Sequence, residues 1–271
     1  AVETARRHGA VPLAVIGTAG TTVTSAFDDL HAIADICEAH GMWFHVDGCY
    51  GGSALFSSGQ AHRLAGVERS DSFVWNLHKM MGMTQQCTAL LIKRPEQLAA
   101  CFAGGADYLF QPDKQFAEFD SGDRTFQCAR RIDVLKLWVA WKAHGDAGFA
   151  ARIDHAMAIA DYTRQRIAAS DGAFVSIVSG SFTNVVFAWV PPELRPLAAL
   201  HPADLDDQVR TQLHHLPPQI KARMQAEGTG MIGFQPVHGM NTFRMICMST
   251  TLQTTDIDAL LDAIDQYGNE I

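Results

Sequence analysis

The sequence predicts an α/β protein with a mostly parallel sheet, followed by a smaller α+β domain. Two observations support this prediction. Residues 11–16 are a continuous apolar run that a helical pattern separates from a second apolar run at residues 42–46, as in a β-α-β unit of a parallel sheet. After about residue 145 the expected strands are grouped and no longer alternate with helices, which is typical of an α+β domain. We therefore divide the chain into domains at 1–144 and 145–271.

The first β-α-β unit is specified by local signals. We expect residues 11–16 to form a strand buried on both faces. Asp28 or Asp29 can cap the following helix, which Gly41 ends. The strand at residues 42–46 then returns parallel to the first. A right-handed crossover places Thr22 and Asp47 at the same edge of the sheet.

Further elements follow in order. Before residue 170 we expect strands at residues 72–75 and 87–93 and helices at 95–101, 132–142 and 148–169, with Gly145 between the last two. Beyond it we expect strands at 174–178, 184–190, 231–236 and 242–248 and a final helix. Thr255 and Asp258 have the spacing of a capping box at the start of that helix.

Composition excludes several classes of function. With 48% hydrophobic and 18% charged residues among 271, the chain is typical of a soluble globular protein. A formal charge of -8 argues against nucleic-acid or anionic-membrane partners, which need clustered basic residues. No apolar run approaches the roughly 18 residues of a spanning helix. Six cysteines without close pairing predict reduced thiols in a cytoplasmic protein, and the histidine spacing predicts no metal site.

The segment at residues 103–125 interrupts the pattern. It carries glycines, a proline and acidic residues, and it is too long for a routine connection. One interpretation is a disordered surface loop. Its four aromatic residues favour a mobile lid or a partner-contacting loop instead.

Lys79 lies in the polar turn after the strand at 72–75, where a buried sheet opens into a crevice. A partly desolvated lysine can attack an aldehyde and form a Schiff base. The usual aldehyde is pyridoxal phosphate, whose ring nitrogen stays protonated beside a carboxylate such as Asp47. The alternative is an exposed turn lysine and a helix-capping aspartate.

Four motifs occur in order: Gly17-Thr-Ala-Gly-Thr-Thr22, His45-Val-Asp-Gly-Cys-Tyr-Gly-Gly52, Asn76-Leu-His-Lys-Met-Met-Gly82 and Tyr108-Leu-Phe-Gln-Pro-Asp-Lys-Gln115. Together they closely resemble the group II pyridoxal-phosphate-dependent amino-acid decarboxylases, in the glutamate and cysteine-sulfinate decarboxylase branch. The resemblance covers the whole chain but only the C-terminal part of the family's longer chains. It implies the type I fold of the aspartate aminotransferases, incomplete at its N-terminus.

The resemblance also implies roles near the cofactor. Lys79 would form the Schiff base and Asp47 would pair with the pyridine nitrogen. Asn76 would contact the cofactor, and His78 would do so at the phosphate unless the backbone satisfies this turn histidine. Cys49 replaces the family's ring-packing alanine, as an apolar spacer rather than a nucleophile.

Three further residues are assigned near the reacting groups. Thr22 would approach the ring, or Thr21 and Thr22 would cap the turn before Asp28. Tyr108 would return a proton after carbon dioxide leaves, or anchor its loop. Arg244 would bind the α-carboxylate of the substrate, which suits its planar fork, or face solvent from its strand.

The implied function is decarboxylation of an acidic L-amino acid, namely glutamate, cysteine sulfinate or aspartate. The family is homodimeric, and the loop carrying Tyr108 would be shared between subunits. Another type I reaction such as transamination is one alternative. An inactive dimerisation module is the other, because residues that complete the family's phosphate cradle do not occur in this sequence.

Overall fold

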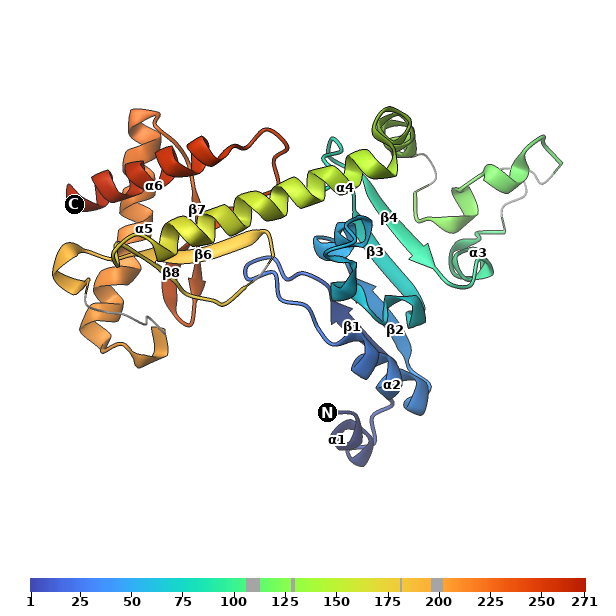
Figure 1. The fold of residues 1–271 in the computed structure, drawn as a ribbon. Helices are drawn as coiled ribbons and strands as arrows, with labels where there is room; N and C mark the ends of the chain where they lie inside the picture. The colour runs from blue at the N-terminus through green and yellow to red at the C-terminus, as the bar shows by residue number, and fades with distance from the viewer. Residues whose placement is uncertain (106–112, 128–129, 181, 196–201) are drawn as a thin grey trace.

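The structure, a computed structural model, describes residues 1–105, 113–127, 130–180, 182–195 and 202–271. Its described part holds two sheets of four strands each, and helix α4 runs past both (Figure 1). The helices are α1 Val2–Arg7, α2 Leu30–His40, α3 Glu96–Phe102, α4 Asp133–Ala168, α5 Asp207–Glu227 and α6 Thr254–Asn269. Among the described residues, no helix is both long enough and apolar enough to cross a membrane.

The first sheet is mixed and mostly parallel, as predicted. Its strands are β1 Ala14–Thr18, β2 Trp43–Asp47, β3 Ser72–Asn76 and β4 Thr88–Ile92, in that spatial order. The first three are parallel and β4 is antiparallel to β3. The parallel strands therefore end at one edge, where Thr18 pairs with Asp47 and Asp47 with Val74.

Helix α2 begins and ends where the sequence predicts. The Asp29 side chain accepts a hydrogen bond from the Ala32 backbone N–H at 3.0 Å, which satisfies one of the free donors of the first turn. Gly41 closes the helix in the left-handed conformation with φ of 64°, which costs glycine little. The β1-α2-β2 unit is thereby confirmed.

Strand β1 differs from the prediction of a strand buried on both faces. It begins at Ala14, and Val11 and Leu13 before it are 89% and 81% exposed. On one face a Cβ at Gly17 would meet the Leu30 side chain at 2.9 Å, so α2 covers that face. On the other face Ile16 is 64% exposed. Strand β1 lies at the edge of the described sheet, so its apolar run marks a strand with one covered face.

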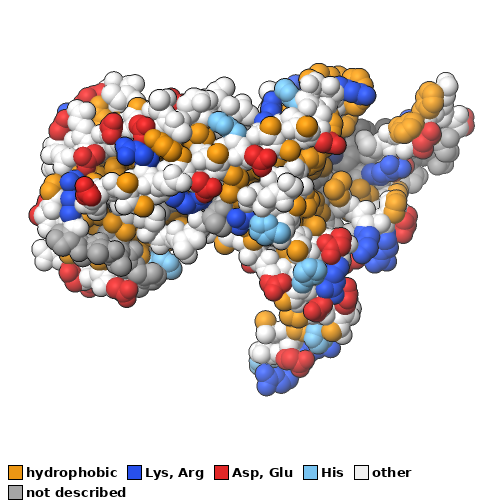
Figure 2. Space-filling model, in the orientation of Figure 1, with side chains coloured by type: hydrophobic (Ala, Val, Ile, Leu, Met, Phe, Trp, Pro, Cys, Tyr) orange, Lys and Arg blue, Asp and Glu red, His pale blue; other side chains and the backbone are white. Residues whose placement is uncertain are grey.

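The predicted break at Gly145 is present as a kink within α4. Gly145 has φ of 62° and ψ of 180°, outside the helical region. Before the kink, α4 and its N-cap expose apolar side chains to solvent, where Figure 2 shows hydrophobic atoms at the surface. These side chains are 52–74% exposed: Ile132, Val134, Leu135, Trp138 and Val139. An exposed apolar patch of this kind is typical of an interaction surface.

The second sheet is antiparallel, with strand order β5-β6-β8-β7. Its strands are β5 Phe174–Ser176, β6 Asn184–Trp189, β7 Gly233–Val237 and β8 Met240–Ile246. Every residue of β6 is buried, because the strand lies between β5 and β8 and packs against helices α4, α5 and α6. The expected grouping of strands in this part of the chain is confirmed.

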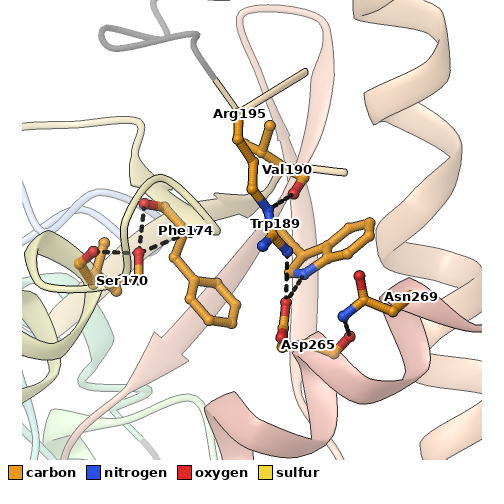
Figure 3. A network of polar contacts seen from close by, with 8 residues as sticks. Ser170, Phe174, Trp189, Val190, Arg195, Asp265 and Asn269 are labelled. Atoms are coloured by element: carbon orange, nitrogen blue, oxygen red, sulfur yellow. Dashed lines mark hydrogen bonds and ion pairs between the residues drawn. The ribbon is translucent and has the colours of Figure 1, made fainter. Parts of the chain in front are cut away.

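Helix α6 is attached to β6 by polar contacts (Figure 3). The Trp189 indole N–H donates to Asp265 Oδ1 at 2.8 Å, and Arg195 donates to the same oxygen at 3.0 Å. Just after α4, Ser170 Oγ accepts a hydrogen bond from the backbone N–H of Phe174, the first residue of β5, at 3.0 Å. The hydrogen bond to Asp265 fixes the Trp189 ring against α6.

The predicted capping box at Thr255 and Asp258 is wrong. The box is present two residues earlier, with Gln253 as N-cap and Asp256 as its partner. Asp258 instead accepts hydrogen bonds from Tyr162 and Arg166 of α4. A contact between distant helices therefore takes the side chain that the local pattern assigned to the cap.

The two sheets are joined by residues that belong to both parts of the sequence. Phe182, which precedes β6, is 1% exposed and packs edge-to-face on Phe27 and Tyr50 from the first part. Phe149 and Ile153 of α4 also lie in the hydrophobic core that surrounds the first sheet. The domain boundary between residues 144 and 145 stays a prediction.

Candidate functional site

The first part of the site is the turn that follows β2. Asp47 is the last residue of that strand, and its Oδ1 accepts a hydrogen bond from the Cys49 backbone N–H at 3.0 Å. The Gly48 backbone N–H donates to the Val74 carbonyl of β3 at 2.9 Å. A carboxylate is thereby held at the edge where the parallel strands end.

Lys79 lies in the turn that follows β3, the neighbouring strand. Its backbone N–H donates to the Asn76 carbonyl at 3.1 Å, and its carbonyl accepts from the Gly82 N–H at 3.0 Å. The flanking Leu77 and Met80 are 1% and 3% exposed and anchor the turn in the core. The Lys79 side chain is half-buried, and its Nζ makes no hydrogen bond or ion pair in the described part of the chain.

Cys49 connects these two turns. Burial raises the pKa of its thiol to about 11, the hydrogen bond and charge of Asp47 add to the rise, and the nearby Lys79 ammonium opposes it. The thiol is therefore protonated at neutral pH, as expected for a spacer rather than a nucleophile. The same interactions show that Asp47 and Lys79 approach Cys49 closely enough for their charges to act on it.

Asn76 and His78 both hydrogen-bond to residues at the start of β4, namely Thr88 and the preceding Cys87. Asn76 Oδ1 accepts from the Thr88 hydroxyl at 2.8 Å. His78 Nδ1 lies 2.8 Å from the Cys87 carbonyl and 3.1 Å from its backbone N–H. The backbone thus satisfies one ring nitrogen of His78. Its Nε2 and the Asn76 amide nitrogen have no partner among the described residues.

Of the two threonines, Thr21 caps the turn before Asp28. Its hydroxyl accepts from the Ala26 backbone N–H and lies 2.9 Å from the Thr24 hydroxyl. The Thr22 side chain is exposed. Thr22 contacts the second sheet through its backbone carbonyl.

Arg244 reaches this carbonyl from β8 of the second sheet. Its Nη1 donates to the Thr22 carbonyl at 2.9 Å, while its Nε–H is buried without an acceptor among the described residues. Arg244 is half-buried, so the alternative of a solvent-facing strand arginine does not describe it. Burial raises the pKa of Tyr50 to about 12, against smaller effects that include a lowering by Arg244. Arg244 therefore lies near Tyr50, next in sequence to Cys49.

The structure thus places Lys79 and Asp47 close enough to Cys49 for their charges to act on its thiol. Arg244 lies near Tyr50, the residue that follows Cys49. Tyr108 lies outside the described residues. Within the described ranges, no three His, Cys, Asp or Glu side chains gather as metal ligands.

Sequence reasoning missed Tyr50, Thr183 and Asn184. The Tyr50 hydroxyl hydrogen-bonds to the other two side chains where the two sheets meet. One signal for them exists in the sequence. Asn184 opens the apolar run of β6, and a polar residue in a buried run needs a specific partner. Its partner is 134 residues away.

Comparisons with known proteins agree with this architecture. Residues 1–190 match the family described as the pyridoxal-dependent decarboxylase conserved domain. The chain is 41% identical to acidic amino acid decarboxylase GADL1 of Bos taurus and 42% identical to cysteine sulfinic acid decarboxylase of Homo sapiens, over 100% and 98% of its length. A crystal structure of mouse CSAD superposes with a TM-score of 0.92 at 40% identity, covering 100% of this chain and 55% of that one.

A mostly parallel sheet that presents a lysine and a carboxylate at one edge, joined to an antiparallel sheet, matches the type I fold of pyridoxal-dependent enzymes. The chain belongs to the pyridoxal-dependent decarboxylase family. It spans about half the length of the curated relatives it matches, 51% and 53% of the two decarboxylases.

Proposed function

We propose that this chain carries the cofactor lysine and the α-carboxylate arginine of a pyridoxal-phosphate-dependent decarboxylase. The observation that carries the proposal is the half-buried Lys79 in the turn after β3, close enough to Cys49 for its charge to act on a thiol that is also hydrogen-bonded to Asp47. The family match and the decarboxylases at 41–42% identity support it.

The side chains present fit pyridoxal phosphate. Lys79 offers an amine without an ion-pair partner in the described part of the chain, and Asp47 offers a carboxylate oxygen for a protonated ring nitrogen. The Asn76 amide nitrogen is a donor beside the same turn, and His78 Nε2 is a ring nitrogen without a partner among the described residues. Bound there, the cofactor would supply an electron sink for the carbanion formed when the α-carboxylate leaves.

The chain's own residues would perform four tasks. Lys79 would bind the cofactor covalently and release it to the substrate amine. Asp47 would hold a proton at the ring nitrogen, and Cys49 would pack against the ring as an uncharged spacer. Thr22 lies beside this region, with its backbone carbonyl facing Arg244 and its side chain exposed. Tyr108, outside the described residues, would return the proton to the α-carbon.

Arg244 would hold the substrate by its α-carboxylate. Because Nη1 is bound to the Thr22 carbonyl, the Nε and Nη2 edge is the pair able to donate two parallel hydrogen bonds to a carboxylate. The unpaired Nε–H supports this assignment, since a buried donor without an acceptor is unfavourable.

The substrate class in this proposal is an acidic L-amino acid: glutamate, cysteine sulfinate or aspartate. It is supported by the names of the relatives, one an acidic amino acid decarboxylase and the other a cysteine sulfinic acid decarboxylase. A cytoplasmic location belongs to the same proposal. It is supported by the free thiols of the five cysteines in the described ranges.

A homodimer that shares the loop carrying Tyr108 is also proposed. The exposed apolar side chains at the N-terminal part of α4 support it, because such a surface is suited to burial against another chain or segment.

The test is carbon dioxide release by the full-length protein from glutamate, cysteine sulfinate, aspartate, 2,4-diaminobutyrate and dihydroxyphenylalanine in parallel. We expect turnover of one or more of the three acidic substrates. Preference for either of the last two would contradict the acidic-substrate assignment and leave decarboxylation intact. Transfer of the amino group without carbon dioxide release would favour transamination, and absence of any cofactor reaction would favour a dimerisation module.

A further inference from the structure

A buried hydrogen-bond network joins the cofactor side of the site to the second sheet. The Tyr50 hydroxyl donates to Asn184 Oδ1 at 2.8 Å and lies 2.5 Å from the Thr183 hydroxyl. Since a phenol has a single proton, Tyr50 must accept from Thr183 while it donates to Asn184. Burial raises the pKa of Tyr50 to about 12, so this proton stays in place across the neutral range.

The other end of the Asn184 side chain holds the loop that contains Thr22. Asn184 Nδ2 donates to the Thr22 carbonyl at 2.9 Å and to the Val23 carbonyl at 3.1 Å. Carbonyl oxygens only accept, so the amide nitrogen must face them and the amide oxygen must face Tyr50. Asn184 is 2% exposed, and both of its side-chain polar atoms have protein partners.

The Thr22 carbonyl is shared, because it also accepts from Arg244 Nη1 at 2.9 Å. Strands β6 and β8 are neighbours, with Asn184 opposite Ile246 and Val186 opposite Arg244. Asn184 and Arg244 are therefore diagonal residues on one face of the sheet. The amide and the guanidinium converge on one backbone oxygen from adjacent strands.

The loop is also fixed from the side of the first sheet. A Cβ at Gly20 would lie 2.8 Å from the Gly51 backbone nitrogen, and one at Gly180 would lie 3.2 Å from the Thr24 carbonyl. The Gly51 N–H donates to the Ala19 carbonyl at 3.0 Å. The backbone around Thr22 is thus packed closely on both sides, and its carbonyl has a defined position.

We propose that Asn184 is a positioning residue that acts through Arg244: it fixes the Thr22 carbonyl, and that carbonyl orients the guanidinium toward the two turns that hold Asp47 and Lys79. The inference rests on the proposed function, in which Arg244 binds the α-carboxylate. Tyr50 and Thr183 support Asn184 by fixing its amide. The network thereby transmits the position of the Cys49-Tyr50 turn to the carboxylate-binding side chain on the other sheet.

The experiment uses the full-length protein with its cofactor and the variant Asn184→Asp. This nearly isosteric change keeps the acceptor for Tyr50 but replaces two donors with an oxygen that faces two carbonyls. We expect KM for the best acidic substrate to rise about tenfold, from the loss of hydrogen bonds that orient Arg244. We expect kcat to change less, since the variant disturbs a substrate-binding side chain and none of the residues proposed to hold the ring or return the proton. Asn241→Asp, a change on β8 that removes donation to the His214 carbonyl, is the matched control and should leave KM unchanged.

The specific readout is the double variant with Arg244→Lys. If Asn184 acts through Arg244, Asn184→Asp should raise KM by less than about twofold in that background. An equal rise in both backgrounds would assign Asn184 a general structural role and overturn the proposal. Unchanged KM in the single variant would overturn it as well.

A second variant covers the case in which Asn184→Asp does not fold. Tyr50→Phe keeps the ring against Phe182 and removes the proton that fixes the Asn184 amide, and we expect a smaller KM increase, about threefold, again lost beside Arg244→Lys. Calorimetric binding of glutarate, a dicarboxylate without an amine, should follow the same pattern. If the wild-type protein released carbon dioxide from no acid, the proposed function would fail while glutarate binding still tested the coupling.

Discussion

Arg244 on β8 donates a hydrogen bond from Nη1 to the Thr22 carbonyl at 2.9 Å, and this contact joins the antiparallel sheet to the loop that follows β1. The contact uses Nη1 and leaves the buried Nε–H without an acceptor among the described residues. A side chain held in this way is oriented before any ligand arrives, which lowers the ordering cost of binding.

Arg244→Lys should weaken the use of every substrate alike. Lysine offers a point charge in place of a planar pair of donors, so we expect KM to rise about ten- to thirtyfold for glutamate, cysteine sulfinate and aspartate together. Steady-state kinetics of the full-length enzyme measure this. Arg223→Lys on α5, whose guanidinium pairs with Glu227 and Glu270, is the control and should leave all three KM values unchanged. A loss confined to one substrate would mean that Arg244 contacts the side chain instead of the α-carboxylate.

Lys79 should be the residue that carries the cofactor in the full-length protein. Borohydride reduction followed by peptide mapping should place the pyridoxyl group on the peptide that spans residues 72–93. Lys79→Arg should remove the label, because a guanidinium stays protonated and does not form the bond. Lys136→Arg should retain it, since Lys136 Nζ is already paired with Asp133 at 2.9 Å. Label on any other lysine would contradict the assignment.

Cys49 should react slowly with alkylating reagents despite its position beside the site. Its pKa is raised to about 11, mainly by burial, so about one thiol in a thousand is ionised at pH 8. Because the raised pKa lies above the assay range, the thiolate fraction, and with it the labelling rate, rises about tenfold per pH unit up to pH 10. Iodoacetamide labelling followed by mass spectrometry measures each cysteine separately. The exposed Cys101 is the internal control, and equal labelling of both at pH 7 would show that Cys49 is ionised.

A site shared between subunits should allow inactive variants to complement each other. Mixing full-length Lys79→Ala and Tyr108→Phe subunits should restore part of the activity, because some mixed dimers then contain one site with both native residues. Homodimers of each variant, kept apart, are the controls. If isotopic labels show that subunits exchange and activity still does not return, each loop serves its own subunit.

Local signals in the sequence were sufficient to predict α2, the position of Asp47 at the end of β2 and the position of Lys79 in the turn after β3. The cap at Asp29, the stop at Gly41 and the apolar runs each act over a few residues. Features that depend on distant partners were missed. Asp258 accepts hydrogen bonds from Tyr162 and Arg166 instead of capping α6. Ile16 is exposed because no described element covers its face of β1.

The joint at Asn184 shows the same limit within the site. Its two carbonyl partners lie about 160 residues away, at separations of 162 and 161, and no periodicity in the sequence encodes such a pair. Burial of a polar residue at the start of an apolar strand indicated only that some partner exists. The motif residues were assigned because short runs of sequence around them resemble the family, and each run is local in the chain.

Gly268→Ala in α6 should destabilise the protein, although alanine is the better helix former. The propensity gain is at most about 1 kcal/mol, and smaller at a position one residue from the helix end. A Cβ at Gly268 would lie 2.5 Å from the Trp189 ring, which is 3% exposed and fixed through its N–H to Asp265. Forcing a methyl group into this contact costs about 1–3 kcal/mol, so overpacking exceeds propensity.

Urea denaturation of the full-length protein measures the net loss caused by Gly268→Ala, which we expect to be about 1–2 kcal/mol in the free energy of unfolding. Gly104→Ala is the matched control, because nothing lies within 4 Å of a Cβ at Gly104. That change should be neutral or slightly stabilising, since alanine restricts the unfolded chain. A stabilising Gly268→Ala would mean that Trp189 can move away from α6, and that its hydrogen bond to Asp265 does not hold the ring in place.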